Sequence, residues 1–231
     1  MSEGVSTHLR AIRERVHQAT ARSGRSVGDC ELLVVSKTWP AEKVAEVVDA
    51  GHQSFGENKV QEAEGKIPLL PAGLRWHLIG HLQRNKVRKA LPLFSTFHGI
   101  DSLKLARYTS GIATELGLKP DIYLQVNLAS EGSKNGYELE GLRRDLDDLF
   151  SLEGIHIHGL MCIPPAASEP EHARPWFIKL RELRDDLEVA SGHALPGLSM
   201  GMSGDFEVAI EEGSTIVRVG SAIFGARDCS V

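Results

Sequence analysis

The stretch LLVVSKTWPAEKVAEVVDAGHQS, residues 32–54, contains the pattern that decides the fold. It opens with a short apolar run rich in β-branched residues, which is typical of a buried strand. Pro40 suits the first turn of a helix, and the valines between Val44 and Val48 supply the apolar face of that helix. A second extended segment is centred near Ser54. The stretch therefore predicts a strand, a helix and another strand in succession.

Extended and helical segments alternate along the rest of the chain. The extended candidates after the first are centred near Ser54, Leu78, Thr96, Leu124, Ile157, Leu198 and Val217. Periodic apolar residues predict helices between nearly all of them, and one more helix at about residues 5–22. Because parallel strands need long crossovers, this order favours a parallel sheet. Eight such units predict a single α/β domain over residues 1–231, a (β/α)8 TIM-like barrel. A doubly wound open sheet is the alternative, although no Gly-x-Gly-x-x-Gly follows the first strand.

Charge balance and cysteine content exclude several classes of protein. The chain has 26 basic and 31 acidic side chains, a net charge of −5, which suits neither a nucleic-acid partner nor an anionic membrane. Its apolar runs fall short of the ~18–20 residues that span a bilayer. Cys30, Cys162 and Cys229 are far apart and odd in number, so they predict no disulfide framework. We therefore expect a cytoplasmic protein.

A lysine stands where the first strand ends. In a parallel barrel, ligands bind at the carboxyl ends of the strands, and Lys37 follows the first strand directly. Apolar barrel walls disfavour the charged ammonium, and a neutral amine can form a Schiff base with an aldehyde or ketone. The alternative is a lysine whose ammonium extends into water.

The last two predicted strands end in turns that suit a phosphate. Ser203 is expected to cap one short helix, and Ser221, after Gly220, to cap another. Paired Gly/Ser turns after the seventh and eighth strands form the usual phosphate site of a barrel, although they could be ordinary capped turns. Arg218 lies inside the last strand and either pairs with a carboxylate or faces a bound ring. An amine, a phosphate site and an arginine together point to pyridoxal 5′-phosphate (PLP).

The histidines predict no metal site. His77 and His81 bracket Gly80, so they do not share a helix face in the way that a metal pair would. His156 and His158 share a strand face without a third ligand, and we expect them to be residues of the barrel layer.

Several motifs, in the same order along nearly the whole chain, resemble the PLP homeostasis protein family, also called the YggS/PROSC family. The motifs are Val34-Val35-Ser36-Lys37-Thr38, Phe55-Gly56-Glu57-Asn58, the run from Trp76 to Lys86, Gly159-Leu160-Met161, Ser199-Met200-Gly201-Met202-Ser203 and Val217-Arg218-Val219-Gly220-Ser221.

The resemblance implies a fold-type III PLP barrel like the N-terminal domain of alanine racemase. It implies that Lys37 forms the internal aldimine and that Arg218 faces the pyridine nitrogen. It places Asn58 beside the ring and the phosphate at Ser203, Gly220 and Ser221, where threonine is common in place of Ser221. It also suggests further site residues, namely Val35, His77, Met161 and Met202, and a loop lysine, Lys134, for a second PLP.

The resemblance and the residues together favour a PLP carrier over a catalyst. A guanidinium beside the pyridine nitrogen disfavours the pyridinium, so the ring would withdraw electrons weakly. A racemase also needs a second acid/base group, and Tyr108, Tyr123 and Tyr137 do not occupy a suitable place. We expect a monomer that holds PLP for intracellular homeostasis and passes it to PLP-dependent apoenzymes. A fold-type III PLP-dependent amino-acid racemase or related PLP enzyme, and a cofactor-free Schiff-base aldolase, are the alternatives.

Overall fold

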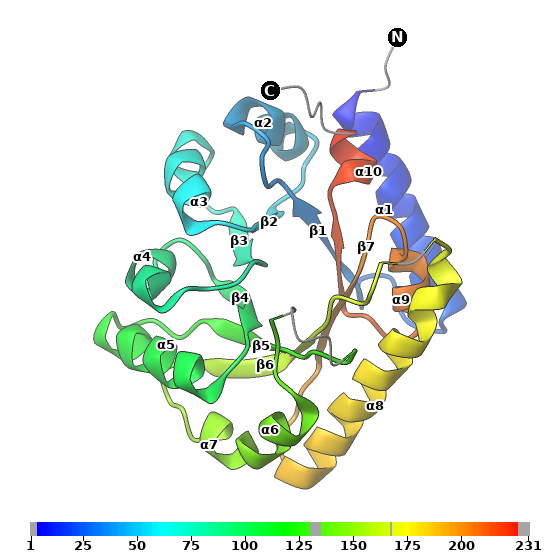
Figure 1. Ribbon diagram of the computed structural model, residues 1–231. Coiled ribbons are helices and arrows are strands. Elements are labelled where there is room, and N and C mark those ends of the chain that lie inside the picture. The colour runs from blue at the N-terminus through cyan, green and yellow to red at the C-terminus, as the bar shows by residue number, and fades with distance from the viewer. Residues whose placement is uncertain (1–3, 130–134, 167, 226–231) are drawn as a thin grey trace.

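The computed structural model describes residues 4–129, 135–166 and 168–225, and its eight strands form a closed parallel barrel (Figure 1). The strands follow one another in sequence order around the barrel, and β1 pairs with β8 to close it. They are β1 Glu31–Val35, β2 Ser54–Glu57, β3 Arg75–Leu78, β4 Thr96–Ile100, β5 Asp121–Gln125, β6 His156–Met161, β7 Gly197–Met202 and β8 Ile216–Val219. The predicted barrel is therefore confirmed, and the open doubly wound sheet is excluded.

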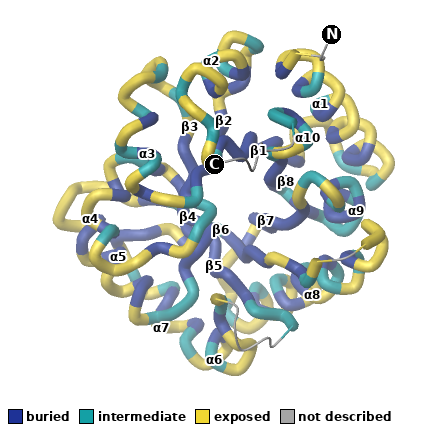
Figure 2. Tube along the Cα trace, turned by 45° about the horizontal axis from the view of Figure 1, so that its top comes forward, coloured by how far each residue is buried: buried dark blue, intermediate teal, exposed yellow. Residues whose placement is uncertain are grey.

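Helices surround the strands and turn their exposed faces outward (Figure 2). The α-helices are α1 Val5–Arg22, α2 Ala41–Asp49, α3 Val60–Lys66, α4 Val87–Ala90, α5 Leu103–Glu115, α6 Leu139–Arg144, α7 Leu146–Phe150, α8 Arg174–Ser191, α9 Phe206–Glu211 and α10 Ser221–Phe224. Short 3₁₀ helices are η1 Ile67–Leu69, η2 Arg84–Lys86 and η3 Pro170–Ala173. Among the described helices, none is both long enough and apolar enough to cross a bilayer.

Alternate side chains of each strand serve two different environments. The outward set, such as Leu32 and Val34 of β1, joins the large core beneath the helices. The inward set includes Leu33 of β1 and Tyr123 of β5, which belong to a separate small cluster inside the barrel. Polar residues also occupy the barrel interior, and they form the base of the candidate site.

The first helix covers the seam where the barrel closes. Its apolar face, predicted from the spacing of Leu9, Ile12, Val16 and Ala19, is buried. This helix packs beside both α9 and α10 (Figure 1).

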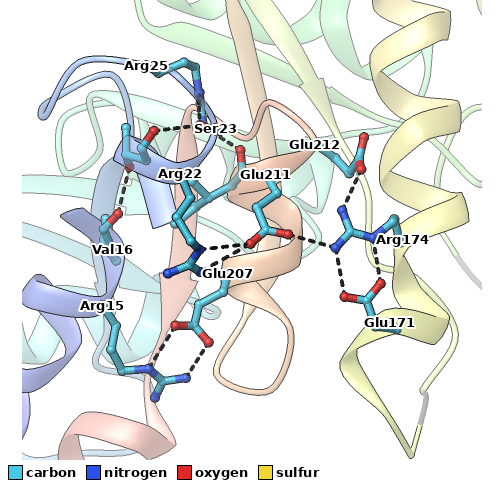
Figure 3. A network of polar contacts seen from close by, with 12 residues as sticks. Arg15, Val16, Arg22, Ser23, Arg25, Glu171, Arg174, Glu207, Glu211 and Glu212 are labelled. Atoms are coloured by element: carbon cyan, nitrogen blue, oxygen red, sulfur yellow. Dashed lines mark hydrogen bonds and ion pairs between the residues drawn. The ribbon is translucent and has the colours of Figure 1, made fainter. Parts of the chain in front are cut away.

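Ion pairs fasten α9 to its neighbours on both sides (Figure 3). Arg15 of α1 pairs with Glu207 at 3.0 Å, and Arg22 pairs with Glu211 at 3.2 Å. From the other side, Arg174 of α8 contacts Glu211 at 2.8 Å. Ion pairs at the surface add little to the free energy of unfolding, so these pairs mainly set the orientation of α9 relative to α1 and α8.

Candidate functional site

A cavity of about 450 Å³ opens at the carboxyl end of the barrel. Its lining gathers residues from the ends of most strands: Val35, Lys37, Trp39, Asn58, Ile79, Gly80, His81, Gln125, Asn135, Ile163, Met202, Ser203, Gly204, Arg218, Gly220, Ser221 and Gly225. Two of the described lining residues, Lys37 and Arg218, are basic, and none is a carboxylate. The cavity therefore favours an anionic ligand of small-molecule size.

The turn that carries Lys37 is held from outside the barrel by one buried ammonium. Lys66 of α3 donates to the backbone carbonyl of Ser36 at 2.9 Å and to Glu57 Oε1 at 2.6 Å. The same Nζ donates to Glu62 Oε1 at 2.9 Å, and Glu62 in turn accepts the backbone N–H of Thr38. Lys66 thus connects the residues on both sides of Lys37.

Two features show that this turn is tightly constrained. Thr38 has a φ of 69°, a left-handed conformation that is costly for a β-branched residue. Glu57 is 0 % exposed, and burial raises the pKa of its carboxyl group, while Lys66 and Ser36 act in the opposite direction. Among the described residues, Glu57 Oε2 has no hydrogen-bond partner. Such costs persist only where the surrounding contacts hold the turn in place.

The turns after β7 and β8 meet through a hydrogen bond. Ser203 Oγ accepts the backbone N–H of Gly220 at 3.3 Å. Gly220 packs against β1, where an added Cβ would lie 3.0 Å from the Val35 carbonyl oxygen. The predicted serine caps are wrong: Asp205 is the residue before α9, and Ser221 is the first residue of α10. The Asp205 carboxylate instead accepts the N–H of Met202 at 2.6 Å, which directs the chain into a turn before the helix begins.

Arg218 lies at the base of the cavity and is only 5 % exposed. Its guanidinium donates to Ser199 Oγ at 2.6 Å and to the Cys162 carbonyl oxygen at 3.0 Å. These partners are neutral, so the alternative of an arginine paired with a carboxylate is not what the described hydrogen bonds show. Burial lowers the pKa of Arg218 from its usual value, but a guanidinium remains protonated.

A chain of hydrogen bonds runs from Arg218 down the barrel interior. His98 Nδ1 lies 2.8 Å from Ser199 Oγ, and His98 Nε2 lies 3.0 Å from His77 Nδ1. Because Arg218 can only donate, the single hydroxyl proton of Ser199 is left for His98 Nδ1. His98 then donates from Nε2 to His77. Burial lowers the pKa of His77 to about 4, and it lowers the pKa of His98 well below its usual value, so both rings are neutral as this order requires.

The cavity unites most of the residues expected from the sequence. Lys37, Asn58, Ser203, Arg218, Gly220 and Ser221 all line it, as do Val35 and Met202. His77 and Met161 do not: His77 lies lower in the barrel, and Met161 is fully buried in the interior cluster. Lys134 lies outside the described residues.

Sequence reasoning missed several lining residues. Ile79 and Gln125 lie two strand positions beyond His77 and Tyr123, on the same inward face, so strand alternation was the signal that could have identified them. His81 lines the rim, and its Nδ1 lies 3.1 Å from Asp101 Oδ2. Trp39, which stacks on Phe224 with ring centroids 5.3 Å apart, had no distinguishing sequence signal.

The tyrosines lie away from the described cavity lining. Tyr123 is buried inside the barrel, where its ring stacks on His98 with centroids 4.6 Å apart. Tyr137 is buried, and Tyr108 lies under the guanidinium of Arg84. The expectation that no tyrosine is placed as a second acid/base group is therefore consistent with the described residues.

Comparisons with known proteins agree with this architecture. A family model for the alanine racemase N-terminal domain matches residues 7–228. Over 220 residues the chain is 43% identical to a protein of Aquifex aeolicus named pyridoxal phosphate homeostasis protein, covering 95% of this chain and 96% of that one. An Escherichia coli K12 protein of the same name is 40% identical, with 98% of each chain covered.

Solved structures share this fold at both high and low sequence identity. PipY of Synechococcus elongatus, solved with PLP bound, is 39% identical with a TM-score of 0.82, covering 93% of this chain and all of that one. Alanine racemase of Clostridium difficile shares the fold at a TM-score of 0.73 but is only 17% identical, and the match covers 97% of this chain and 58% of the racemase.

Proposed function

This chain belongs to the pyridoxal phosphate homeostasis protein family, within the alanine racemase N-terminal domain fold, and from that premise we propose that it binds PLP in the described cavity and acts in intracellular PLP homeostasis. The observation that carries the proposal is the convergence of Lys37, Arg218 and the two serine turns on one cavity free of described carboxylates.

The residues present fit the coenzyme. PLP combines an aldehyde, an aromatic pyridine ring and a phosphate ester, and when bound it supplies an electrophilic carbon on an electron-withdrawing ring. Lys37 offers an amine, Arg218 and Lys37 offer positive charge, and Ser203 and Ser221 offer hydroxyl donors. Gly220 lines the cavity next to Ser221.

Each residue then has a distinct role. Lys37 would hold the coenzyme through its amine, whose condensation with the aldehyde would form a C=N bond and release one water. Ser203, Gly220 and Ser221 hold the phosphate, Asn58 lies beside the ring, and Val35 and Met202 contribute apolar contact. Arg218 would face the pyridine nitrogen, and Ser199 and the Cys162 carbonyl oxygen hold its guanidinium in place.

We propose a carrier because Arg218 is a poor partner for a catalytic ring. A permanent positive charge beside the pyridine nitrogen disfavours its protonation and so weakens support for carbanion chemistry. The proposed role is to hold PLP, limit the free aldehyde in the cytoplasm and pass the coenzyme to apoenzymes. We propose that the protein does this as a monomer.

One observation favours a second candidate, a fold-type III PLP-dependent amino-acid racemase. His81 lines the same cavity as Lys37, and its Nδ1 lies 3.1 Å from Asp101 Oδ2, so an imidazole oriented by a carboxylate is present in the site. Assay of common amino acids for racemisation separates the two candidates. Turnover at about 1–10³ s⁻¹, lost in His81→Ala, would replace the carrier proposal.

The absorbance spectrum tests PLP binding directly. Wild type loaded with PLP should absorb at about 420 nm, the region of a PLP–lysine Schiff base, and Lys37→Ala should lose this band. Lys104→Ala on α5 is a matched loss of an exposed lysine and should keep it. Borohydride, which supplies hydride to the C=N bond, should fix the coenzyme to the peptide containing Lys37. An unchanged spectrum in Lys37→Ala would contradict the assignment, and failure to bind PLP would favour the cofactor-free aldolase.

The proposed monomeric state and the proposed delivery of PLP to apoenzymes need separate measurements. Light scattering on the PLP-loaded protein should give the mass of one chain, near 25.2 kDa. Mixing the loaded protein with the apo form of a PLP-dependent enzyme should restore that enzyme's activity faster than an equal amount of PLP held by serum albumin. No recovery would contradict the delivery role while leaving PLP binding intact.

A further inference from the structure

The amino end of the barrel, opposite the cavity, carries a cluster of metal-ligating side chains. Asp121 is the first residue of β5, and His156 and His158 stand at the start of β6. No third candidate ligand for the two histidines was evident from the sequence, but the structure places the Asp121 carboxylate beside them. Asp121 lies directly opposite His156 in the register of the two strands, a relation that only the folded barrel reveals.

The three side chains offer ligand atoms within reach of one ion. One nitrogen of each histidine and one carboxylate oxygen all lie within 4.8 Å of one another. His156 Nδ1 already contacts Asp121 Oδ1 at 2.7 Å. In a tetrahedral site with bonds of about 2.1 Å, ligand atoms lie about 3.4 Å apart, so small side-chain rotations complete the geometry.

The backbone of β6 explains why both histidines face the same place. The register between β5 and β6 shifts after Ile122, so that Tyr123 pairs with Gly159 and His158 is the extra residue. The His158 ring lies 5.7 Å from the His156 ring, measured between centroids.

Packing holds His158 in position. Its ring lies edge-on to Tyr123 at 5.4 Å, and Gly197 leaves room for it, since an added Cβ there would lie 2.6 Å from the His158 ring. The side chain of His158 is itself half-buried. By contrast, the side chains of His156 and Asp121 are 55% and 48% exposed, which leaves an entry path from solvent.

We propose that Asp121, His156 and His158 form a binding site for one divalent transition-metal ion of the zinc class. Two imidazoles and one carboxylate suit Zn²⁺ and its neighbours Co²⁺ and Ni²⁺ better than Ca²⁺ or Mg²⁺, which prefer oxygen ligands. Three protein ligands leave at least one position for water. The proposal is independent of the function proposed for the cavity, because the two sites lie at opposite ends of the strands.

Titration with Zn²⁺, followed by calorimetry, tests the site. All variants carry Cys229→Ser, because Cys30 and Cys162 are buried but Cys229 lies outside the described residues. The parent protein should bind about one equivalent of Zn²⁺. Asp121→Asn preserves the size of the carboxylate and His158→Ala removes one ligand, and each should weaken binding by about tenfold or more.

His193→Ala is the matched control. His193 is an exposed histidine that stacks on Phe150, and its loss should leave the affinity unchanged. Equal affinity in parent, Asp121→Asn and His158→Ala, or no binding at about 1 mM Zn²⁺, would overturn the proposal.

A measurement on the parent protein alone covers the case in which a variant fails to fold. With imidazole nitrogens labelled with ¹⁵N, Zn²⁺ should shift the resonances of His156 and His158 and leave that of His98 in place. Shifts confined to other histidines would refute the site.

Discussion

Replacing Lys66 by methionine should destabilise the protein by removing the ammonium that organises the turn at Lys37. The change deletes hydrogen bonds to Ser36, Glu57 and Glu62 at 2.9, 2.6 and 2.9 Å. Lys66 and Glu57 are 6% and 0% exposed, so Glu57 would be left as a buried charge. Breaking a buried pair in this way costs about 3–5 kcal/mol, and we expect a loss of that size at pH 8.

The loss should shrink at low pH, because Glu57 can take up a proton. Burial already raises the pKa of Glu57, and removing Lys66 takes away the main opposing attraction. The folded variant then binds a proton more tightly than the unfolded chain does. Its stability is fully present below the unfolded carboxyl value, about 4.3, and falls as pH rises through the raised folded value. The deficit relative to wild type should therefore be smaller at pH 5 than at pH 8.

Urea unfolding followed by circular dichroism at pH 5 and pH 8 measures both deficits. Lys89→Met removes an exposed pair with Glu64 and should cost at most about 1 kcal/mol at either pH. The double variant Lys66→Met/Glu57→Gln should recover part of the loss at pH 8, because no buried charge remains. A Lys66→Met loss no larger than that of Lys89→Met, or equal at both pH values, would refute the reasoning.

Three further predictions concern the barrel and its interior. Gly80→Ala should cost about 1–3 kcal/mol in urea unfolding, because the new Cβ would lie 2.2 Å from the Asn58 carbonyl oxygen. Ser199→Ala should cost about 1–3 kcal/mol in the same assay, because it leaves a buried Arg218 N–H unpaired. Burial raises the pKa of the Cys162 thiol to about 12, so iodoacetamide at pH 8 should label Cys162 in urea-unfolded protein and leave it unlabelled in folded protein, as peptide mass spectrometry can show.

Matched substitutions give the reference for the first two of these. Gly111→Ala lies in α5, where nothing is within 4 Å of the new Cβ, and should not destabilise the protein. Ser221→Ala removes an exposed hydroxyl and should change stability by at most about 0.5 kcal/mol. Suppose that Gly80→Ala and Ser199→Ala lower the free energy of unfolding no more than these controls. Then neither the close approach of Gly80 to Asn58 nor the hydrogen bond between Ser199 and Arg218 contributes to stability. Rapid labelling of folded Cys162 would contradict its burial.

The sequence was sufficient to predict the barrel because local residue patterns indicate where its strands and most of its helices lie. The run from Leu32 to Val35 is apolar and β-branched, and the turn residues after it are distinctive. Once strands are parallel, their carboxyl ends must share a rim, so Lys37 and Ser203 were expected to meet although 166 positions separate them.

Other features depend on how deep a residue lies in the barrel and on how neighbouring strands align. Sequence patterns do not specify either. His77 belongs to a motif next to the site, but its position two residues before the rim places it inside the barrel, where it meets His98. Periodic apolar residues predicted helical segments between the strands, but between β5 and β6 the chain forms two short helices, α6 and α7, with Asp145 between them. The pairing of Asp121 with His156 required the alignment of β5 on β6, which no local signal specifies.

The closure of the barrel by β1 and β8 has a consequence for synthesis on the ribosome. At about 5–20 residues per second, β1 emerges roughly 10–40 s before the strand that must sit beside it. During that interval the apolar stripe of α1, including Leu9 and Val16, lacks the α9 and α10 surfaces that will cover it. The nascent chain therefore exposes an apolar helix for most of the time that its synthesis takes. We expect chaperones that bind nascent polypeptides to bind this helix.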